Sequence, residues 1–171
     1  MEVEAKTKDD SSLSLSPISV PPVGIVSAGM YLPEPVLTAA DIAEESGLPE
    51  WVVREKLGIN QKRMAGPDDH PNQMAVWAAQ DCLSKCDIPP EEIDVVLCTT
   101  EEWKEYLQWT AGIDLAYKIG ATRAWGMDLH MRCCTTISAL KMAKDMMVAD
   151  PGVGWVWGAT CVKWGPCETD A

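Results

Sequence analysis

The fold of this chain is decided by one stretch, Trp125-Gly126-Met127-Asp128-Leu129-His130-Met131-Arg132-Cys133-Cys134-Thr135-Thr136. Its first nine residues alternate between apolar side chains and polar or small ones, which is the period of a half-buried β-strand. From Cys134 onward, apolar residues recur at roughly helical spacing among good helix formers. The stretch therefore predicts a strand that runs directly into a helix, with Cys133 at the junction.

The cysteine at this junction is a candidate nucleophile. The first turn of a helix carries backbone N–H groups without intrahelical partners, and it lies at the positive end of the helix dipole. Both effects favour thiolate over thiol and lower the pKa of a cysteine placed there. Because the thiolate is the reactive form in covalent catalysis, a cysteine at this position could act as an activated nucleophile.

Length and charge limit the possible classes of protein. The 171 residues are about one domain, and the net charge of −12 argues against non-specific binding to nucleic acid or to an anionic membrane. No apolar run approaches the ~20 residues that span a bilayer, and the N-terminus shows no basic region followed by an apolar run. We therefore expect a cytoplasmic protein whose seven cysteines are mostly reduced.

The cysteine spacings do not suggest a metal site. The chain has no Cys-x-x-Cys and no Cys/His pairing at zinc-finger spacing, so neither a metal nor a cofactor is expected. Cys82 and Cys86 lie four residues apart on a predicted helix, and we interpret them as small buried side chains.

Strands and helices are predicted to alternate along the chain. Residues 1–22 mix charge, Ser and Pro and are expected to be a disordered leader, followed by one domain over 23–171. The predicted strands are Val23–Gly29, Ile93–Thr99, Trp125–Cys133 and Val153–Thr160, and the predicted helices are Ala39–Ser46, Pro49–Leu57, Asn72–Lys85, Trp103–Ile119 and the segment after Cys134. This order predicts an α/β fold, with a mostly parallel sheet and helices on both faces. In such folds the functional groups lie at the carboxyl ends of the strands.

A basic segment interrupts the acidic chain. Between Arg54 and Arg63, four basic residues stand against one acid, Glu55, which gives a local charge of +3; the basic residues are Arg54, Lys56, Lys62 and Arg63. Such a segment can hold a phosphate-bearing ligand, or it can be a solvated helix face.

Six segments, taken in order, resemble one protein family. They are Gly24–Pro33, Glu50–Arg63, Met74–Ala79, Ile93–Thr100, Met127–Cys133 and Val156–Ala159. Together they resemble the N-terminal half of the thiolase-superfamily condensing enzymes, of the ketoacyl-ACP synthase III type, with 3-hydroxy-3-methylglutaryl-CoA synthase a close second. The similarity extends over about residues 23–160.

The resemblance implies a reaction and roles for three residues. It places the nucleophile, which attacks an acyl-CoA or acyl-ACP thioester before condensation with a malonyl thioester, at Cys133. It places a residue that stacks on the CoA adenine at Trp51. It also places Arg54 near the family's CoA-binding arginine, with a spacing that differs by one residue.

The family's second half supplies a catalytic His and Asn, and this chain stops before it. Neither His70 nor His130 occupies the position of that histidine, and His130 is predicted to face away from Cys133. We therefore expect an acyltransferase that is incomplete as this chain alone, completed by homodimerisation or by a partner chain with the second half.

Two alternatives remain open. The chain can be a non-catalytic half-domain that pairs with a partner chain, with Cys133 inert. It can also be a fragment closer to 3-hydroxy-3-methylglutaryl-CoA synthase, whose general acid is a Glu. Glu101 and Glu102 lie near that position, although the aligned residue is Thr100, and both can equally be acids at a helix N-terminus. The Cys134-Thr135 pair after Cys133 also departs from the family, which has a small residue and then Gly.

Overall fold

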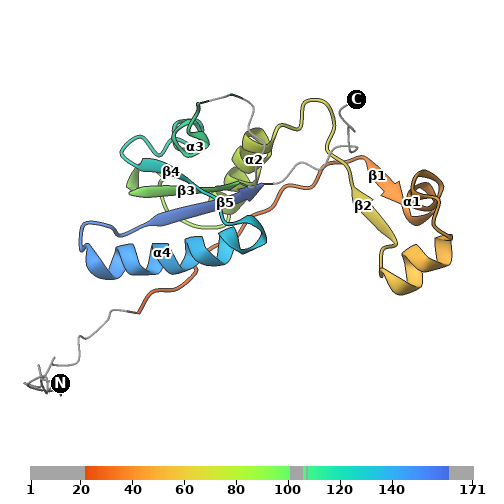
Figure 1. The fold of residues 1–171 in the computed structure, drawn as a ribbon. Helices are drawn as coiled ribbons and strands as arrows, with labels where there is room; N and C mark the ends of the chain where they lie inside the picture. The colour runs from red at the N-terminus through yellow and green to blue at the C-terminus, as the bar shows by residue number, and fades with distance from the viewer. Residues whose placement is uncertain (1–21, 101–105, 107, 162–171) are drawn as a thin grey trace, which may run out of the picture.

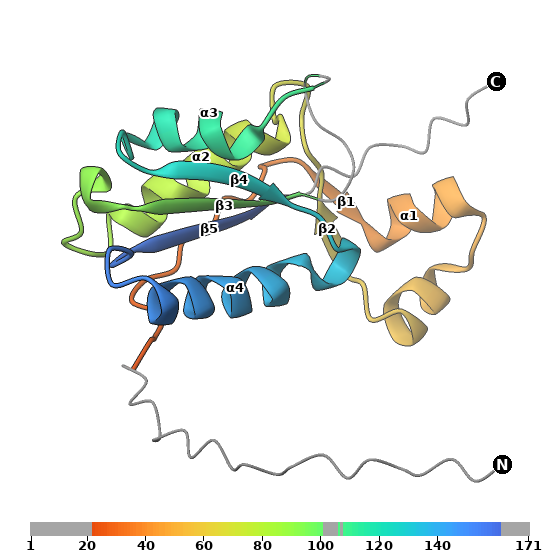
Figure 2. The same ribbon diagram turned by 60° about the vertical axis from the view of Figure 1, so that its left-hand side comes forward.

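The computed structural model describes residues 22–100, 106 and 108–161, and within them the chain forms two parts (Figure 1). The larger part is a three-stranded sheet with helices on both faces. The smaller part is a hairpin–helix unit, residues 36–63, that lies beside the sheet. In both views it lies on the side toward which the carboxyl ends of the strands point (Figures 1 and 2).

The sheet is parallel, and the strand that comes first in the sequence among its three strands, β3, lies at the centre. Its order is β4-β3-β5, with bounds β3 Val95–Thr100, β4 Trp125–Leu129 and β5 Val156–Cys161. Residues 95–99 of β3 are all buried. A short apolar run of this kind is typical of a parallel strand that is covered on both faces. The predicted parallel sheet is therefore confirmed.

Helices cover the two faces of the sheet (Figure 2). One face carries α2 Pro71–Leu83 and α3 Ala111–Ile119, and the other carries α4 Thr135–Ala149. The central strand alternates between two apolar clusters. Val96 and Cys98 pack with residues of α2 and α3, whereas Val95 and Leu97 pack with Ala139 of α4. The period of two in β3 thus builds one core on each side, as the α/β prediction requires.

Helix α3 packs directly on the backbone of β4. A Cβ atom on Gly126 would lie 2.5 Å from the carbonyl oxygen of Gly112, and one on Gly112 would lie 2.8 Å from that of Met127. The carboxylate of Asp128 accepts hydrogen bonds from the N–H groups of Ala111 and Gly112, at 3.1 and 2.7 Å. The two glycines and this carboxylate together fix the start of α3 against the edge strand.

The hairpin–helix unit follows local signals closely. Its strands, β1 Val36–Thr38 and β2 Gln61–Arg63, pair antiparallel, and α1 Ala39–Ser46 follows β1. Thr38 and Asp41 form a reciprocal capping box, and Gly47 at φ 71° ends the helix. The bounds predicted for α1 are confirmed. The second predicted helix is present as a short helix with a π-turn over Val52–Lys56.

The predicted strand Val23–Gly29 is wrong, because this segment docks on α2 and not on the sheet. The Ser27 hydroxyl donates to the Cys82 carbonyl at 2.9 Å, and the Met30 N–H donates to the Asp81 carboxylate at 2.9 Å. Residues 22–33 adopt no regular structure, and Ile25 and Val26 are 75% and 63% exposed. The apolar run that suggested a strand is largely uncovered.

Tyr31 anchors the end of this segment. Its ring stacks near Trp77 of α2, and its hydroxyl donates to the Asp69 carboxylate at 2.8 Å. The hydrogen bond to Asp69 raises the pKa of Tyr31 above its ordinary value, because ionising the phenol would bring two negative charges together.

Other predicted bounds lie partly outside the described residues. α3 begins at Ala111 and not at Trp103, and Gln108 just before it has φ 53°. Residues 1–21 of the predicted leader, residues 101–105 and 107, and residues 162–171 are not among those described. In the described ranges, no helix combines the length and the apolarity needed to cross a bilayer.

Candidate active site at Cys133

Cys133 lies in a turn between β4 and α4. The strand ends at Leu129, a 3₁₀ turn covers Arg132–Cys134, and α4 begins at Thr135. The prediction that the strand runs to Cys133 is therefore wrong by four residues. The predicted order is right: the thiol comes after the carboxyl end of β4 and immediately before a helix.

A buried threonine holds this turn in place. Thr135 is 4% exposed, and its hydroxyl accepts the Met131 N–H at 2.7 Å and donates to the Arg132 carbonyl at 2.6 Å. Arg132 has φ 55°, in the left-handed region that side chains other than glycine rarely adopt. The threonine thus stabilises an uncommon backbone at the residue next to the candidate nucleophile.

The thiols of the turn are accessible. Cys133 and Cys134 are both exposed, whereas Cys82 and Cys98 are buried in the core. The first turn of α4 follows at once, and such a turn presents N–H groups without intrahelical partners. A nucleophile with adjacent N–H donors suits attack on a carbonyl carbon, because the donors can stabilise the oxyanion that forms.

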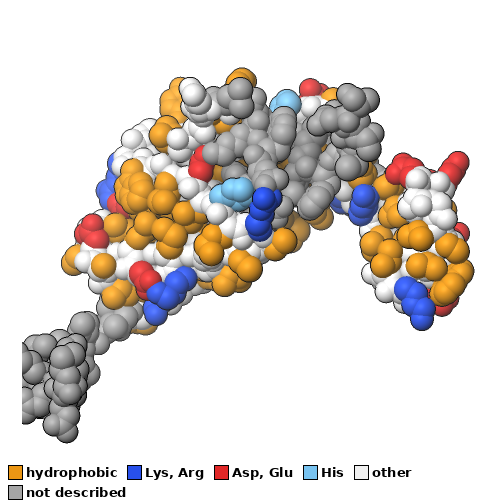
Figure 3. Space-filling model, in the orientation of Figure 1, with side chains coloured by type: hydrophobic (Ala, Val, Ile, Leu, Met, Phe, Trp, Pro, Cys, Tyr) orange, Lys and Arg blue, Asp and Glu red, His pale blue; other side chains and the backbone are white. Residues whose placement is uncertain are grey.

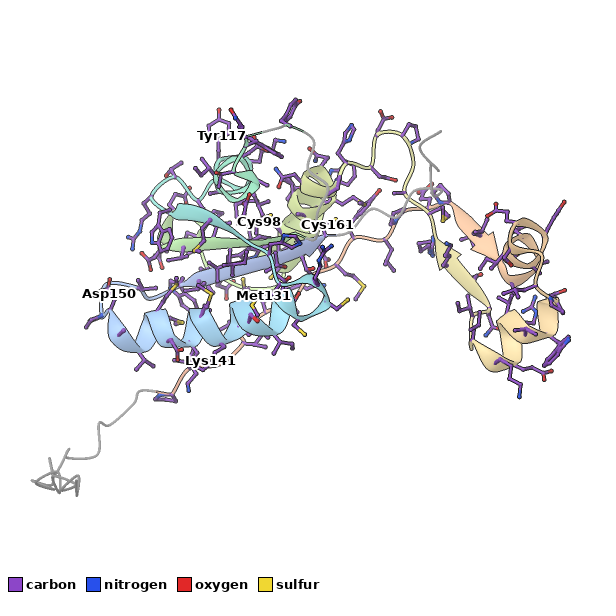
Figure 4. All side chains as sticks on the ribbon, viewed as in Figure 1. Cys98, Tyr117, Met131, Lys141, Asp150 and Cys161 are labelled. Carbon is purple, nitrogen blue, oxygen red and sulfur yellow. The ribbon has the colours of Figure 1, made fainter. Side chains whose placement is uncertain are left out.

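Exposed apolar side chains lie in the turn and in the first half of α4. Met131, Ile137 and Leu140 are 59%, 70% and 48% exposed. Figure 4 shows Met131 at the N-terminal end of α4 and Cys161 at the carboxyl end of β5, so both belong to the same edge of the sheet. Hydrophobic side chains also spread over the visible face of the sheet domain in Figure 3.

The two histidines lie at the ends of different elements. His130 follows the last residue of β4 and is exposed, and His70 is the N-cap of α2. His70 lines a shallow hollow between α2 and α3, together with Gln73, Tyr106, Trp109, Asp114 and Lys118. This hollow was not foreseen from the sequence, because its residues come from segments 33 or more positions apart.

Trp51 and Arg54 belong to the hairpin–helix unit, whereas Cys133 belongs to the sheet. The Trp51 side chain is 52% exposed. The Arg54 guanidinium donates to the Glu50 carboxylate at 2.7 Å and to the Asn60 side chain at 3.3 Å. An aromatic surface and a guanidinium therefore lie on one short exposed helix, on the side of the molecule that the strand ends face.

The rest of the basic segment serves two roles. Arg63 donates to the carbonyl oxygens of Pro33 and Glu34, both at 3.0 Å, and so fastens β2 to the loop before β1. Lys56 and Lys62 are exposed. A count of charges in the sequence cannot distinguish Arg63, which binds backbone carbonyls, from Lys56 and Lys62, which are exposed, because each residue counts as one positive charge.

Two further sequence interpretations concern acidic residues and cysteines. Glu101 and Glu102 lie outside the described residues. Cys82 is buried and Cys86 half-buried, and the Cys86 thiol donates to the Cys82 carbonyl at 3.7 Å. Within the described residues, no group of three or more His, Cys, Asp or Glu side chains is placed to hold a metal ion.

Comparison with curated proteins gives relatives named β-ketoacyl-ACP synthase III. No family model matches the chain. The β-ketoacyl-ACP synthase III of Symbiobacterium thermophilum is 32% identical over 128 residues, which are 75% of this chain and 38% of the relative. That of Bacillus pumilus is 29% identical over 124 residues, 72% of this chain and 39% of the relative. The chain thus spans about two fifths of the length of these relatives.

Solved structures agree with the sequence comparison. The β-ketoacyl-ACP synthase III of Thermus thermophilus superposes with a TM-score of 0.70 at 26% identity, over 86% of this chain and 47% of that protein. The priming β-ketosynthase of the R1128 polyketide pathway gives a TM-score of 0.68 at 26% identity, over 79% of this chain and 40% of that protein. The predicted resemblance to the thiolase-like condensing enzymes of the ketoacyl-ACP synthase III type is therefore confirmed, in sequence and in fold, for about three quarters of this chain.

Proposed function

We propose that this chain carries the acyl-accepting cysteine of a ketoacyl-ACP synthase III-type reaction, and that this cysteine is Cys133. In the proposed step the Cys133 sulfur attacks the thioester carbonyl of an acyl-CoA or acyl-ACP. A new C–S bond forms, the old C–S bond breaks, and the carrier leaves as a thiol after taking up a proton. The single observation that carries the proposal is an exposed thiol at the carboxyl edge of the sheet, before a helix, in a chain 32% identical to a synthase III.

The second step requires more polypeptide than the described residues contain. Condensation of the acyl group with a malonyl thioester, which loses CO₂, belongs to the whole enzyme in this proposal. The exposed apolar side chains Met131, Ile137 and Leu140 would be covered by a homodimer contact or by a partner chain that supplies the second half. The alternative, a half-domain that pairs without catalysis, predicts the same covering but no acylation.

We further propose that Trp51 and Arg54 bind the CoA carrier. The half-exposed indole offers a face for the adenine, and the guanidinium offers paired donors for phosphate. Arg54 would then exchange Glu50 for a phosphate group, which is feasible because both side chains are about 45% exposed and the pair is weak in water.

The test of the nucleophile is acylation of the reduced chain. Incubation with an acyl-CoA should add one acyl group to the tryptic peptide 133–141, which contains Cys133 and Cys134 and no other cysteine. Cys133→Ser should abolish the adduct, and Cys134→Ser should retain it. If wild-type protein shows no adduct at Cys133, even with a partner chain that supplies the second half, the nucleophile assignment is wrong.

The carrier site is tested by titration with CoA. Arg54→Gln and Trp51→Ala should each weaken CoA binding. The matched control is Lys118→Gln, since Lys118 also forms an i,i+4 ion pair on an exposed helix but lies on α3. Equal loss of affinity in Lys118→Gln would assign the effect to net charge and refute a site at Trp51 and Arg54.

A further inference from the structure

We propose that Cys133 and Cys134 are a reversible redox site, in which peroxide converts the two thiols into a disulfide between neighbouring residues. The disulfide itself depends only on the two thiols. Its consequence, a reversible block of acyl transfer, rests on the function proposed above for Cys133.

Among the cysteines that the structure describes, this pair stands out by its exposure. Both thiols of the 3₁₀ turn are exposed, Cys82 and Cys98 are buried at 8% and 4%, and Cys161 is half-buried in β5. An oxidant in solution therefore meets the turn first. Because the two residues are adjacent in the chain, the concentration of one thiol at the other does not depend on the concentration of the protein.

The chemistry balances with peroxide as the oxidant. The Cys133 sulfur attacks one peroxide oxygen, so an S–O bond forms, the O–O bond breaks, and one water leaves. The product is a sulfenic acid at Cys133. The Cys134 sulfur then attacks the Cys133 sulfur, so the S–S bond forms, the S–O bond breaks, and the hydroxyl leaves as a second water with the thiol proton. A small-molecule dithiol returns both thiols by two exchange steps.

The turn can rearrange to allow this bond, and the bond would be easily reduced. Consecutive Cα atoms are ~3.8 Å apart, which is shorter than the usual span of a disulfide and so implies strain. Strained disulfides have higher potentials and are the labile ones. Residues 131–134 are all exposed, so bringing the two sulfurs together takes no side chain out of either apolar cluster. The Thr135 hydroxyl hydrogen-bonds the backbone of Met131 and Arg132, so the rearrangement would take place at Cys133 and Cys134.

The site would protect the nucleophile as well as switch it. A sulfenic acid without a neighbouring thiol is oxidised further to sulfinic acid, which a dithiol does not reverse. With Cys134 adjacent, the sulfenic acid is removed as soon as it forms. The departure from the family at this position, a second cysteine after the first, thus acquires a chemical role.

The experiment is peroxide treatment of the full chain, alkylation of the remaining thiols, and mass spectrometry of the tryptic peptide 133–141. Wild-type protein should give a peptide that lacks two hydrogen atoms and carries no alkyl group, and dithiothreitol before alkylation should restore two alkylated cysteines. Cys134→Ser should instead accumulate sulfinic acid at Cys133. Two alkylated cysteines after oxidation, sulfinic acid in wild type at the rate of the variant, or a bond from Cys133 to Cys161 would each overturn the proposal.

Acylation measured on the same samples separates this inference from the proposed function. Adduct formation in reduced protein that falls to background after peroxide and returns with dithiothreitol supports both. A disulfide that forms in protein that is never acylated refutes the acyl-transfer function alone. Acylation without a disulfide refutes the redox site alone.

Discussion

Replacing Gly126 with alanine should separate α3 from the sheet. The added Cβ would lie 2.5 Å from the Gly112 carbonyl oxygen, whereas ordinary contacts begin near 3.4 Å, so the two backbones must part by 3.4 − 2.5 = 0.9 Å. That shift stretches the Asp128 contacts to Ala111 and Gly112, now 3.1 and 2.7 Å, beyond good hydrogen-bonding distance. Overpacking of ~1–3 kcal/mol and weakened charge-assisted bonds together give a loss of about 2–4 kcal/mol in the free energy of unfolding.

The chain offers a matched control for this substitution. Gly158 is also a strand glycine, in β5, but a Cβ there would meet only the Leu97 carbonyl oxygen, at 4.0 Å. Alanine at Gly158 should therefore be neutral or should stabilise by up to ~1 kcal/mol, because glycine is unfavourable in a strand. Urea denaturation followed by circular dichroism gives both values. If Gly126→Ala unfolds within ~0.5 kcal/mol of wild type, the close approach of α3 to β4 is wrong.

Three further outcomes follow from the geometry. Asp94→Asn should lower stability by about 1 kcal/mol at neutral pH, a small value because Arg123 is 58% exposed. The hydrogen bond from Arg123 lowers the pKa of Asp94 below 3.8. The stabilisation by the Asp94 carboxylate is therefore complete above pH 3.8 and is lost as the pH falls through the lowered pKa. Denaturation at pH 7 and at strongly acidic pH should show that the stability difference between wild type and Asp94→Asn disappears in acid. Tyr31→Phe should remove the hydrogen bond to Asp69 and lower the urea midpoint. In an absorbance titration, wild-type Tyr31 should ionise above pH 10.0. The stabilisation by this hydrogen bond is therefore complete below pH 10.0 and is lost as the pH rises through the raised pKa of Tyr31. Native alkylation should modify Cys133 well before the buried thiols, and equal rates across all cysteines would show that the core opens readily.

Much of the fold could be predicted because its signals are local. Thr38 and Gly47 specify both ends of α1 through side-chain capping and a left-handed backbone, and neither depends on distant residues. The short, mostly apolar run Ile93–Thr99 predicted a buried parallel strand, and the structure has one at Val95–Thr100. Cys133 was predicted at the carboxyl end of its strand, and it lies in a turn just beyond that end, because the alternation of strands and helices predicts their order better than their limits.

The errors arose where the outcome depends on a distant partner. Val23–Gly29 has the composition of a strand, but a strand needs a neighbour to pair with, and the segment bonds to Cys82 and Asp81 of α2 instead. The contact between Gly112 and Gly126 was equally invisible, because two glycines fourteen positions apart carry no pattern that pairs them.

The end of β4 shows why the site itself was displaced by a few residues. Apolar and polar side chains alternate through Cys133, but ladder pairing stops at the Thr99–Leu129 pair. Beyond that point the sequence keeps its period of two while the backbone leaves the sheet, turns at Arg132 and is fastened by Thr135. Alternation reports which side chains prefer burial, and pairing decides where a strand ends. Alternation and pairing give different ends for a strand where the chain leaves the sheet before the alternation stops, and here Cys133 lies in the segment that has left the sheet.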